Sequence, residues 1–370
     1  MLQRALCTIH RESIHAKRDP EAVGVTRERA PIDQGGNAMK RSVRRPGRLL
    51  FAVFAAALAF GAAPLPASAQ LEIKFGHVGN PGSLFAKSAE EFARRANAAL
   101  AGKAKVVVYG SSQLGGDKEM LQKLKLGTLD MALPSTVMSS EVDLLGFFEM
   151  PYIVKDRAEM HRIEKEIFWP SMEPAIEKKG LEVLAVWENG FRQITNNKRP
   201  IRVPADLQGI KLRVPEGKWR VRMFEAYGAN PSPMKFSELF TALQTGVMDG
   251  EENPLTQIWS AKLQEVQKYL SMSSHVYTPA YVTVGIAHWK TLPPDVRKIL
   301  EDTAKGTQAF VYQTAEHDEA ELLGKLKAAG MQVNDVDKEA FVKASQPIYA
   351  EFEKDVPGAK ALIDRAATLR

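Results

Sequence analysis

The sequence predicts an α/β protein of two domains, and three observations support this fold class. Its 370 residues exceed what one small hydrophobic core usually organises. Hydrophobic residues make up 45% and charged residues 25% of the chain, which is ordinary for soluble globular proteins and disfavours disordered or fibrous classes. From residue 71 onward, strand-like and helix-like segments alternate, and this alternation is typical of doubly wound α/β units.

The first α/β unit is expected at the start of the alternating region. Strand patterns occupy residues 71–78, 104–109 and 129–133. Ser83 is suited to cap a helix in which apolar residues recur at helical spacing from Phe85 to Ala96. Asp117 is expected to cap a second helix over residues 118–126. The predicted order is therefore strand, helix, strand, helix, strand.

The rest of the chain continues this alternation with more interruptions. Helices are expected over residues 156–179, 217–227 and 237–245, and strands over residues 181–187, 210–214 and 276–286. Residues 230–233 are expected to form a turn, and residues 249–254 a tight turn into a helix. The helical stretch from Pro294 to Ala329 would be roughly 50 Å long at 1.5 Å per residue, which is enough to run along both domains and tie them together.

The excess of basic residues belongs to the start of the chain. Residues 1–38 carry six Lys and Arg and five Asp and Glu, and residues 39–69 carry five basic residues and no acidic one. Subtracting these from the totals of 50 and 44 leaves 39 of each sign in residues 70–370. A neutral body argues against a polyanionic partner, so no nucleic-acid binding is expected.

Residues 39–69 have the pattern of an export signal peptide. Basic residues follow Met39, an apolar run of 15 residues extends from Leu49 to Ala63, and small residues end the segment at Ala69. The run is short for a membrane span, which needs about 20 residues, so no membrane insertion of the mature chain is expected. Residues 1–38 are expected to be an over-called start, and the mature protein is expected to begin near Gln70.

The sequence offers little support for catalysis or metal binding. The only cysteine, Cys7, precedes the expected mature chain, which excludes disulfides, a thiol nucleophile and thiolate metal ligands there. The five histidines after residue 70 lack the spacing of zinc sites, and the nucleophile-elbow, phosphate-loop and dinucleotide-binding motifs are absent. We therefore expect no catalytic residue, no metal and no cofactor.

Polar residues in the middle of the chain are the candidate binding residues. Arg192 follows a predicted strand, where ligand-facing loops of α/β sheets begin. Alternation along residues 210–214 places Lys211 and Arg213 on one face, which is either a solvated basic face or a carboxylate clamp that uses the planar arginine fork. By pattern alone, Asn253 is more consistent with a cap or turn residue, Phe236 and Trp187 with core residues, and His275 with either a pocket or a surface position.

Four long motifs resemble the solute-binding proteins of tripartite ATP-independent periplasmic (TRAP) transporters. The motifs are residues 108–130, NGFRQITNNKRPI at 189–201, LQGIKLRVP at 207–215 and PMKFSELFTALQTGVMDGEENP at 233–254. The resemblance is to the DctP family, of the C4-dicarboxylate and sialic-acid binding type, and it extends over residues 71–360 in family order. It implies a two-lobed periplasmic binding protein with a hinge and a long helix spanning both lobes.

The resemblance also implies a function and lobe boundaries. Such a protein closes on a small organic acid in the periplasm and delivers it to a permease of one small and one large membrane subunit, which is driven by an ion gradient. Lobe I would combine residues 70–189 with 279–318, and lobe II residues 190–278 with 319–370. The chain would cross between the lobes at residues 189–190 and about 275–280.

Site residues follow from matching the family motifs. The resemblance implies that Arg213 binds the ligand carboxylate, that Arg192 is a second contact and that Asn253 completes the carboxylate site. It further implies that Phe236 is a pocket wall and Asp117 a partner for ligand hydroxyls. Ser135 and His275 fall where some members place ligand or bound-water contacts. Val78 and Ser135 replace polar and acidic pocket residues of the sialic-acid binders, which disfavours sialic acid.

Two other classes of function remain open from the sequence. A secreted hydrolase or lyase could use Asp117, Glu188 and His275, and it would show turnover, whereas a binding protein returns its ligand intact. A sensor that presents the bound acid to a membrane receptor has the same sequence features as a transport protein. Neighbouring genes for the two permease subunits would distinguish these last two.

Overall fold

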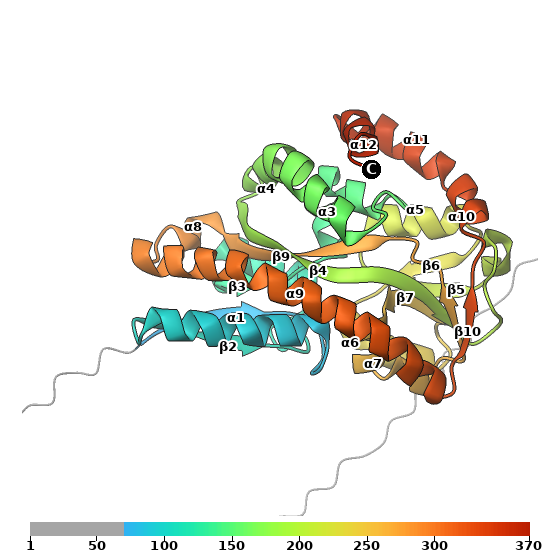
Figure 1. The fold of residues 1–370 in the computed structure, drawn as a ribbon, viewed down its shortest axis with the longest axis horizontal. Helices are drawn as coiled ribbons and strands as arrows, with labels where there is room; N and C mark the ends of the chain where they lie inside the picture. Colours follow the sequence, from blue (N-terminus) through green and yellow to red (C-terminus); the bar gives the residue numbers. More distant parts are fainter. Residues whose placement is uncertain (1–69) are drawn as a thin grey trace, which may run out of the picture. The chain divides into compact units, whose positions relative to one another are not determined.

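A mixed β-sheet flanked by helices organises the computed structural model, which describes residues 70–370 (Figure 1). The predicted signal peptide and over-called start therefore lie outside the described residues. Along the sheet the strands follow the order β2-β1-β3-β9-β4-β7-β5-β6, with β8 pairing β4 and β10 pairing β8. This arrangement is the α/β fold class that the sequence predicts.

Two half-sheets share the long strand β4 (Leu181–Asn196). The first half-sheet contains β1 (Leu71–Gly76), β2 (Ala104–Tyr109), β3 (Met131–Ala132), β9 (Tyr277–Gly285) and residues 181–191 of β4. The second half-sheet contains β5 (Lys211–Val214), β6 (Asn230–Pro233), β7 (Gly250–Pro254), β8 (Tyr269–Met272), β10 (Gln332–Asp335) and residues 192–196 of β4.

The passage of β4 from one half-sheet to the other is marked by an irregularity. The pairing of β4 with β9 shifts register between Glu188 and Gly190. Gly190 has a φ of 120°, which side chains other than glycine rarely adopt. The two residues therefore break the regular ladder where the sequence predicts a crossing between lobes.

The helices of the first half-sheet follow the sequence closely. Helix α1 (Leu84–Leu100) is capped by Ser83, whose Oγ accepts a hydrogen bond from the backbone N–H of Ala86 at 3.2 Å, as predicted. Helix α2 (Asp117–Leu126) ends at Gly127, but its N-cap is Gly116. The predicted capping role of Asp117 is therefore wrong, because Asp117 is the first residue inside the helix.

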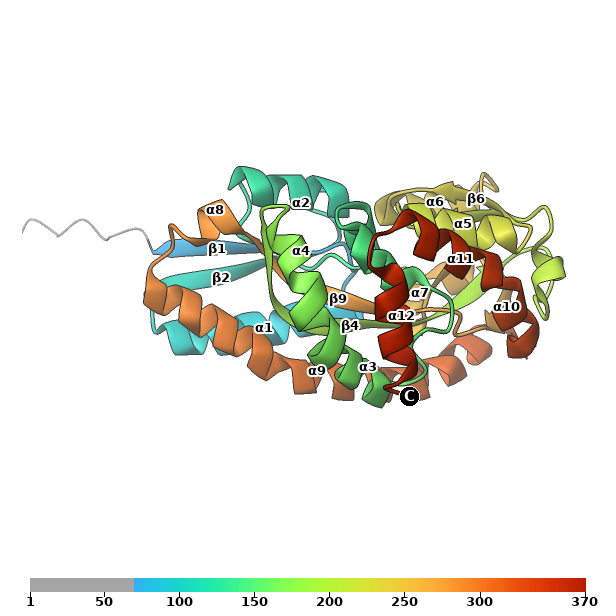
Figure 2. The same cartoon turned by 90° about the horizontal axis from the view of Figure 1, so that it is seen from above.

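The long helix α9 (Pro294–Ala328) confirms the predicted helix across both halves of the protein. It packs against α1, then along β4, and then against α7 (Leu255–Ser260) of the second half (Figure 1). The C-terminal helices α10 (Lys338–Ala344), α11 (Gln346–Asp355) and α12 (Ala359–Ala367) follow, and α11 packs on α5 (Lys218–Ala226) (Figure 2).

Several segments differ from the predicted elements. The region 156–179 is divided into α3 (Arg157–Ile163), a π-helical segment (Glu164–Met172) that contains Pro170, and α4 (Glu173–Glu177). The predicted turns at residues 230–233 and 249–254 are largely strands β6 and β7. The prolines of β6 are tolerated because β6 ends the strand order and has only one partner.

The remaining elements are short, apart from α6. They are 3₁₀ turns at Thr136–Ser140, Asp143–Glu149, Pro204–Leu207 and Leu263–Glu265, and helices α6 (Phe236–Gln244) and α8 (Ile286–Trp289).

Two hydrophobic cores hold these layers together. In the first, Trp187 of β4 lies in edge contact with Phe75 and Phe92, and its Nε1 donates to the carbonyl of Ala304 at 3.0 Å. This confirms the prediction that Trp187 is a core residue. The second core forms where α6 and α7 meet the C-terminal half of α9, with Leu243 and Leu326 as buried members.

Candidate functional site

A narrow cavity lies between elements of the two half-sheets. Six of the seven residues predicted to bind ligand line it. The lining residues are Val78, Phe85, Asp117, Ser135, Thr136, Val137, Asn189, Arg192, Arg213, Pro215, Phe236, Asn253 and Gln257. The seventh predicted residue, His275, is not among them. The fold thus gathers residues that are more than 170 positions apart in the sequence.

Arg213 is the arginine of the cavity that forms no ion pair with an acidic residue among residues 70–370. It lies in β5 with 3% of its surface exposed, while Lys211 on the same strand is exposed. Its Nε and Nη2 donate to the carbonyl of Met234 at 3.0 and 2.6 Å, and its guanidinium lies 5.9 Å from the ring centre of Phe236. Within residues 70–370 it forms no ion pair. A buried cation without a counter-ion is costly, so this position favours an anion in the cavity.

Burial also affects the pKa of Arg213. Loss of water around the guanidinium lowers its pKa to about 10, and the nearby charge of Arg192 acts in the same direction. At neutral pH the group therefore remains a cation. A bound carboxylate would offset both effects.

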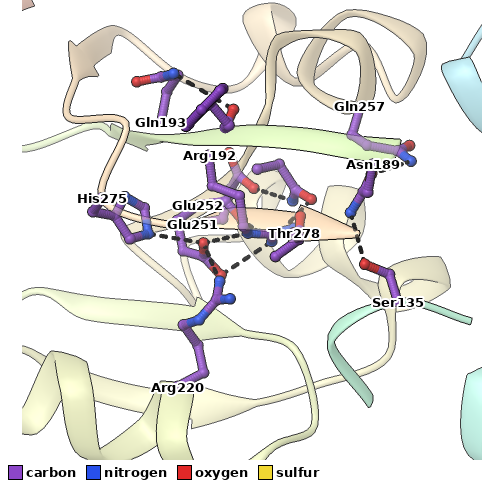
Figure 3. Close-up of polar contacts among 12 residues, drawn as sticks. Ser135, Asn189, Arg192, Gln193, Arg220, Glu251, Glu252, Gln257, His275 and Thr278 are labelled. Atoms are coloured by element: carbon purple, nitrogen blue, oxygen red, sulfur yellow. Dashed lines mark hydrogen bonds and ion pairs between the residues drawn. The ribbon is translucent and has the colours of Figure 1, made fainter. Parts of the chain in front are cut away.

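Arg192 lies inside strand β4, not in a loop after a strand as predicted. Its Nε donates to Glu252 Oε2 at 2.5 Å, and its Nη2 donates to Glu252 Oε1 at 3.0 Å and to Asn253 Oδ1 at 3.1 Å (Figure 3). Glu252 thus balances its charge. Within the described residues, neither Arg192 Nη1 nor Arg213 Nη1 donates a hydrogen bond. Each arginine therefore retains one free amino group beside the cavity.

A buried ion network supports Arg192 from behind. Arg220 of α5 donates to Glu252 Oε2 at 2.6 Å (Figure 3). It also donates to Glu149 Oε2 at 3.0 Å. All three side chains are at most 2% exposed. Burial alone would raise the pKa of Glu252, but Arg192 and Arg220 together lower it far below its ordinary value. Glu252 is therefore ionised and holds two arginines in place.

His275 belongs to this network and does not line the cavity. Its Nε2 lies 3.1 Å from Glu252 Oε2, and its Nδ1 lies 2.8 Å from Ser273 Oγ. Burial lowers the pKa of His275, so the neutral ring is favoured. Because the ionised Glu252 can only accept, Nε2 carries the proton and donates to it. His275 thus contacts Glu252, and the predicted ligand or bound-water contact of His275 stays a prediction.

Asn253 is held between Arg192 and a second acid. Its Oδ1 accepts from Arg192 Nη2, and its Nδ2 donates to Glu251 Oε2 at 2.5 Å. Burial raises the pKa of Glu251 to about 7. Glu251 and Glu252 contact different groups on opposite sides of β7, as the alternation of an extended chain requires.

A chain of polar side chains borders the cavity beside Arg192. Ser135 Oγ donates to the carbonyl of Pro279 at 2.7 Å, and Asn189 Nδ2 donates to Ser135 Oγ at 3.3 Å. Gln257 Nε2 donates in turn to Asn189 Oδ1 at 3.4 Å (Figure 3). Asn189, Gln257 and Thr136 also line the cavity, although the sequence did not predict them there. For Asn189 the signal was its place in the NGFR motif, whereas Gln257 and Thr136 carried no local signal.

Asp117 completes the polar lining. Its Oδ1 is buried and has no hydrogen-bond partner among the described residues, as is also true of Thr136 Oγ1 and Gln257 Oε1. Burial raises the pKa of Asp117 to about 7, although the charge of Arg213 opposes this shift. Buried polar atoms normally have partners. Three of the ten unpartnered buried atoms in residues 70–370 lie on this one cavity, which indicates a polar ligand.

Helix orientation adds to the positive field of the arginines. The cavity is lined by the first residue of α6, Phe236; the first turn of α2 also borders it but already carries the acids Asp117 and Glu119. The N-terminus of a helix carries a partial positive charge and free backbone N–H groups. The site is therefore suited to a small anion.

The geometry does not assemble a catalytic group from the residues of the hydrolase alternative. Of Asp117, Glu188 and His275, only Asp117 lines the cavity. Glu188 is instead bound by Arg157, with 2.6 Å between Glu188 Oε1 and Arg157 Nη2. Residues 70–370 also contain no group of three or more His, Cys, Asp or Glu side chains arranged to hold a metal ion. The arrangement can bind and orient an acid.

Comparison with known proteins gives the same picture. Residues 75–355 match the family model of the bacterial extracellular solute-binding proteins, family 7 (DctP). The C4-dicarboxylate-binding periplasmic protein DctP of Rhodobacter capsulatus is 33% identical over 328 residues, which cover 87% of this chain and 98% of that protein. The 2,3-diketo-L-gulonate-binding periplasmic protein YiaO of Escherichia coli is 33% identical over 259 residues, which cover 69% of this chain and 79% of that protein.

Solved structures agree in fold. A TRAP periplasmic solute-binding protein from Polaromonas sp. JS666, bound to D-erythronate, has a TM-score of 0.77 at 33% identity and covers 80% of this chain and 98% of its own. One from Sulfurospirillum deleyianum, with bound succinate, has a TM-score of 0.78 at 31% identity and covers 81% and 99%. These matches confirm the predicted fold of the TRAP solute-binding proteins. The chain belongs to family 7 of the bacterial extracellular solute-binding proteins.

Proposed function

We propose that this chain is the solute-binding subunit of a TRAP transporter and captures a small organic acid in the cavity between its two half-sheets. The observation that carries the proposal is Arg213, a buried cation without an acidic partner that faces the cavity next to Arg192. The relatives support it, because several proteins that are similar in sequence or structure are named for carboxylic acids that they bind.

In this proposal each cavity residue has a separate role in binding the ligand. Arg213 and Arg192 bind the carboxylate through their free amino groups, and Asn253 keeps Arg192 oriented. Phe236 forms a wall, while Asp117 and Ser135 contribute to the polar lining. His275 acts on the site only through Glu252. A binding role without catalysis is consistent with the cavity lining, which includes Asp117 but neither Glu188 nor His275 of the hydrolase alternative.

Closure of two lobes would bury the ligand. We assign residues 70–189 and 279–318 to one lobe and residues 190–278 and 319–370 to the other, with β4 as one crossing. Small-angle scattering tests this: the radius of gyration should fall when ligand saturates the protein. An unchanged radius would contradict hinge closure.

The proposed location is the periplasm, and the proposed partner is a permease of one small and one large membrane subunit. Within the described residues, no helix is both long and apolar enough to span a bilayer. Protein recovered from the periplasm should begin within a residue or two of Gln70. Recovery of residues 1–38 on it would contradict both the signal peptide and the over-called start.

A thermal-shift screen of the exported protein against small carboxylic acids tests the binding function. Ligand at 100 times its dissociation constant should stabilise the protein by about 2.7 kcal/mol. Acid released from the denatured complex should be chemically unchanged, whereas a hydrolase or lyase would return a product. A screen in which no carboxylic acid stabilises the protein would overturn the proposal.

A further inference from the structure

We infer that the bound acid carries a single carboxylate and hydroxyl groups, and that Gln257 and Asp117 select it over dicarboxylates. This inference rests on the proposed function and adds the chemistry of the part of the ligand that lies beyond its carboxylate. It follows from which hydrogen-bond donors and acceptors of the cavity remain free.

The number of carboxylates follows from the balance of buried charges. Arg192 is paired with Glu252, and Arg220 lies between Glu252 and Glu149. These two arginines and two glutamates compensate one another. Arg213 is the remaining arginine on the cavity, and no ion pair within residues 70–370 involves it. One ligand carboxylate neutralises it. The other acids whose charges act on Arg213, Asp117 and Glu251, can only add negative charge, so a second ligand carboxylate would have no cation of its own.

The orientation of the Gln257 amide follows from a chain of hydrogen bonds that ends at a carbonyl group. The carbonyl of Pro279 can only accept, so the hydroxyl of Ser135 donates to it. Ser135 Oγ therefore accepts from Asn189 Nδ2, which turns Asn189 Oδ1 toward Gln257. Gln257 must then present Nε2 to Asn189.

The consequence is that Gln257 keeps a free acceptor. Gln257 is 3% exposed and lines the cavity, and its Oε1 is buried without a partner in the described part of the chain (Figure 3). This orientation depends on the bonding chain and not on the assignment of amide atoms, which are otherwise interchangeable. The cavity therefore requires a hydrogen-bond donor from the ligand at this point.

Asp117 places a second free acceptor on the same cavity. Its Oδ1 is buried and unpartnered, and the neighbouring backbone N–H of Gly116 is taken by Glu119 Oε2. Two acidic residues thus already occupy the first turn of α2. A hydroxyl group can donate to either acceptor, whereas a carboxylate offers only further acceptors and an extra negative charge. Hydroxy acids are therefore favoured and dicarboxylates disfavoured.

Calorimetry on protein purified from the periplasm tests this with pairs of acids of equal length. Each pair compares a polyhydroxy monocarboxylate with the diacid in which the terminal CH₂OH is a carboxylate, for example erythronate with meso-tartrate and galactonate with galactarate. Butanoate and succinate provide ligands without hydroxyls. In the pair that binds best, the monocarboxylate should bind about tenfold or more tightly than the diacid.

Two variants assign the selection to residues. Gln257→Met removes the acceptor and should weaken the best hydroxy acid about tenfold while leaving butanoate unchanged. Asp117→Asn introduces a hydrogen-bond donor. It should therefore reduce the ratio between the affinities for the hydroxy acid and for its diacid. Gln264→Met is the matched control, because Gln264 Oε1 is also buried and unpartnered but lies outside this cavity. It should leave binding unchanged.

The outcomes separate this inference from the proposed function. A diacid that binds within twofold of its hydroxy acid, or more tightly, overturns the inference, and the proposed function survives if Arg213→Lys still weakens that diacid. Absence of binding by every acid overturns both. If Gln257→Met fails to fold, the comparison of acids on the unmodified protein still tests whether hydroxy acids are preferred over diacids.

Discussion

Arg192 and Glu252 form a two-pronged ion pair across strands β4 and β7, with 2.5 Å between Nε and Oε2 and 3.0 Å between Nη2 and Oε1. The side chains are 2% and 0% exposed. The ion pair occupies Nε and Nη2 of Arg192, so Arg192 can offer a ligand only Nη1. Arg213, whose Nε and Nη2 both bond one carbonyl, is the arginine that still lacks a negative partner.

Arg213→Lys should weaken binding of the cognate acid by about one to two powers of ten while the fold survives. Lysine keeps the charge but loses the planar fork that holds the carbonyl of Met234 and a carboxylate together. Arg213→Ala should weaken binding further, because the ligand carboxylate would be buried without its main partner. Isothermal calorimetry measures both.

Lys211→Ala is the control for Arg213. Lys211 is exposed on the same strand and should matter little. Equal damage from Lys211→Ala, or binding by Arg213→Lys within about twofold of the unmodified protein, would favour a generic basic face instead.

Glu252→Gln should destabilise the protein by about 3–5 kcal/mol, because it leaves Arg192 and Arg220 buried without full compensation. Urea unfolding measures this loss. Glu321→Gln removes a carboxylate that is 45% exposed and pairs within its own helix, and should leave the free energy of unfolding nearly unchanged. Similar effects of the two substitutions would show that the buried network contributes little to stability.

His77 should make the protein less stable as the pH falls from 6.5 to about 4. Burial lowers the pKa of His77 from 6.5 to about 4, although a hydrogen bond to Gly79 opposes this. Between these values the unfolded chain binds a proton that the folded protein excludes, so stability rises with pH and is lost on acidification. The shift corresponds to about 3 kcal/mol.

Comparison with a variant isolates this contribution from other titrating groups. His77→Gln retains an N–H donor but does not titrate, so its stability should fall less than that of the unmodified protein over the same pH range. His317→Gln changes an exposed histidine on α9 and should follow the unmodified protein. Parallel pH profiles for the unmodified protein and His77→Gln would exclude this role for His77.

Two adjacent ion pairs of opposite polarity connect α2 to the second half-sheet at the cavity. Lys118 pairs with Glu216 at 3.3 Å, and Glu119 pairs with Lys235. Because closure would form these pairs, Glu119→Gln should speed ligand release by about two- to fivefold, and added salt should reduce the difference. Stopped-flow displacement measures the release rate.

Charge exchange provides the internal check for these ion pairs. Glu119→Lys should speed release further, and combining it with Lys235→Glu should restore much of the original rate. Glu91→Gln removes an acid that pairs only within α1 and should leave the rate unchanged. Failure of the double variant to recover would show that the pair does not act during closure.

The sequence alone determined the elements whose signals are local. The Ser83 cap, strand β2 and helix α9 lie where capping and apolar periodicity predict them, because both signals depend on neighbours a few residues away. The family resemblance then predicted seven binding residues, and the fold places six of them around one cavity. Their role in binding stays a prediction.

Only the tertiary structure decided features that depend on distant partners. Residues 250–254 form a strand because β4 and β5 lie on either side of them, although their composition is typical of a turn. Arg192 is committed to Glu252, and His275 lies behind the cavity, because Arg220 and Glu149 from other elements complete the network. Gln257 faces the cavity through a bond chain that begins at Pro279. Strand pairing and buried ion pairs join residues far apart in the chain, so local sequence patterns carry no information about which partners meet.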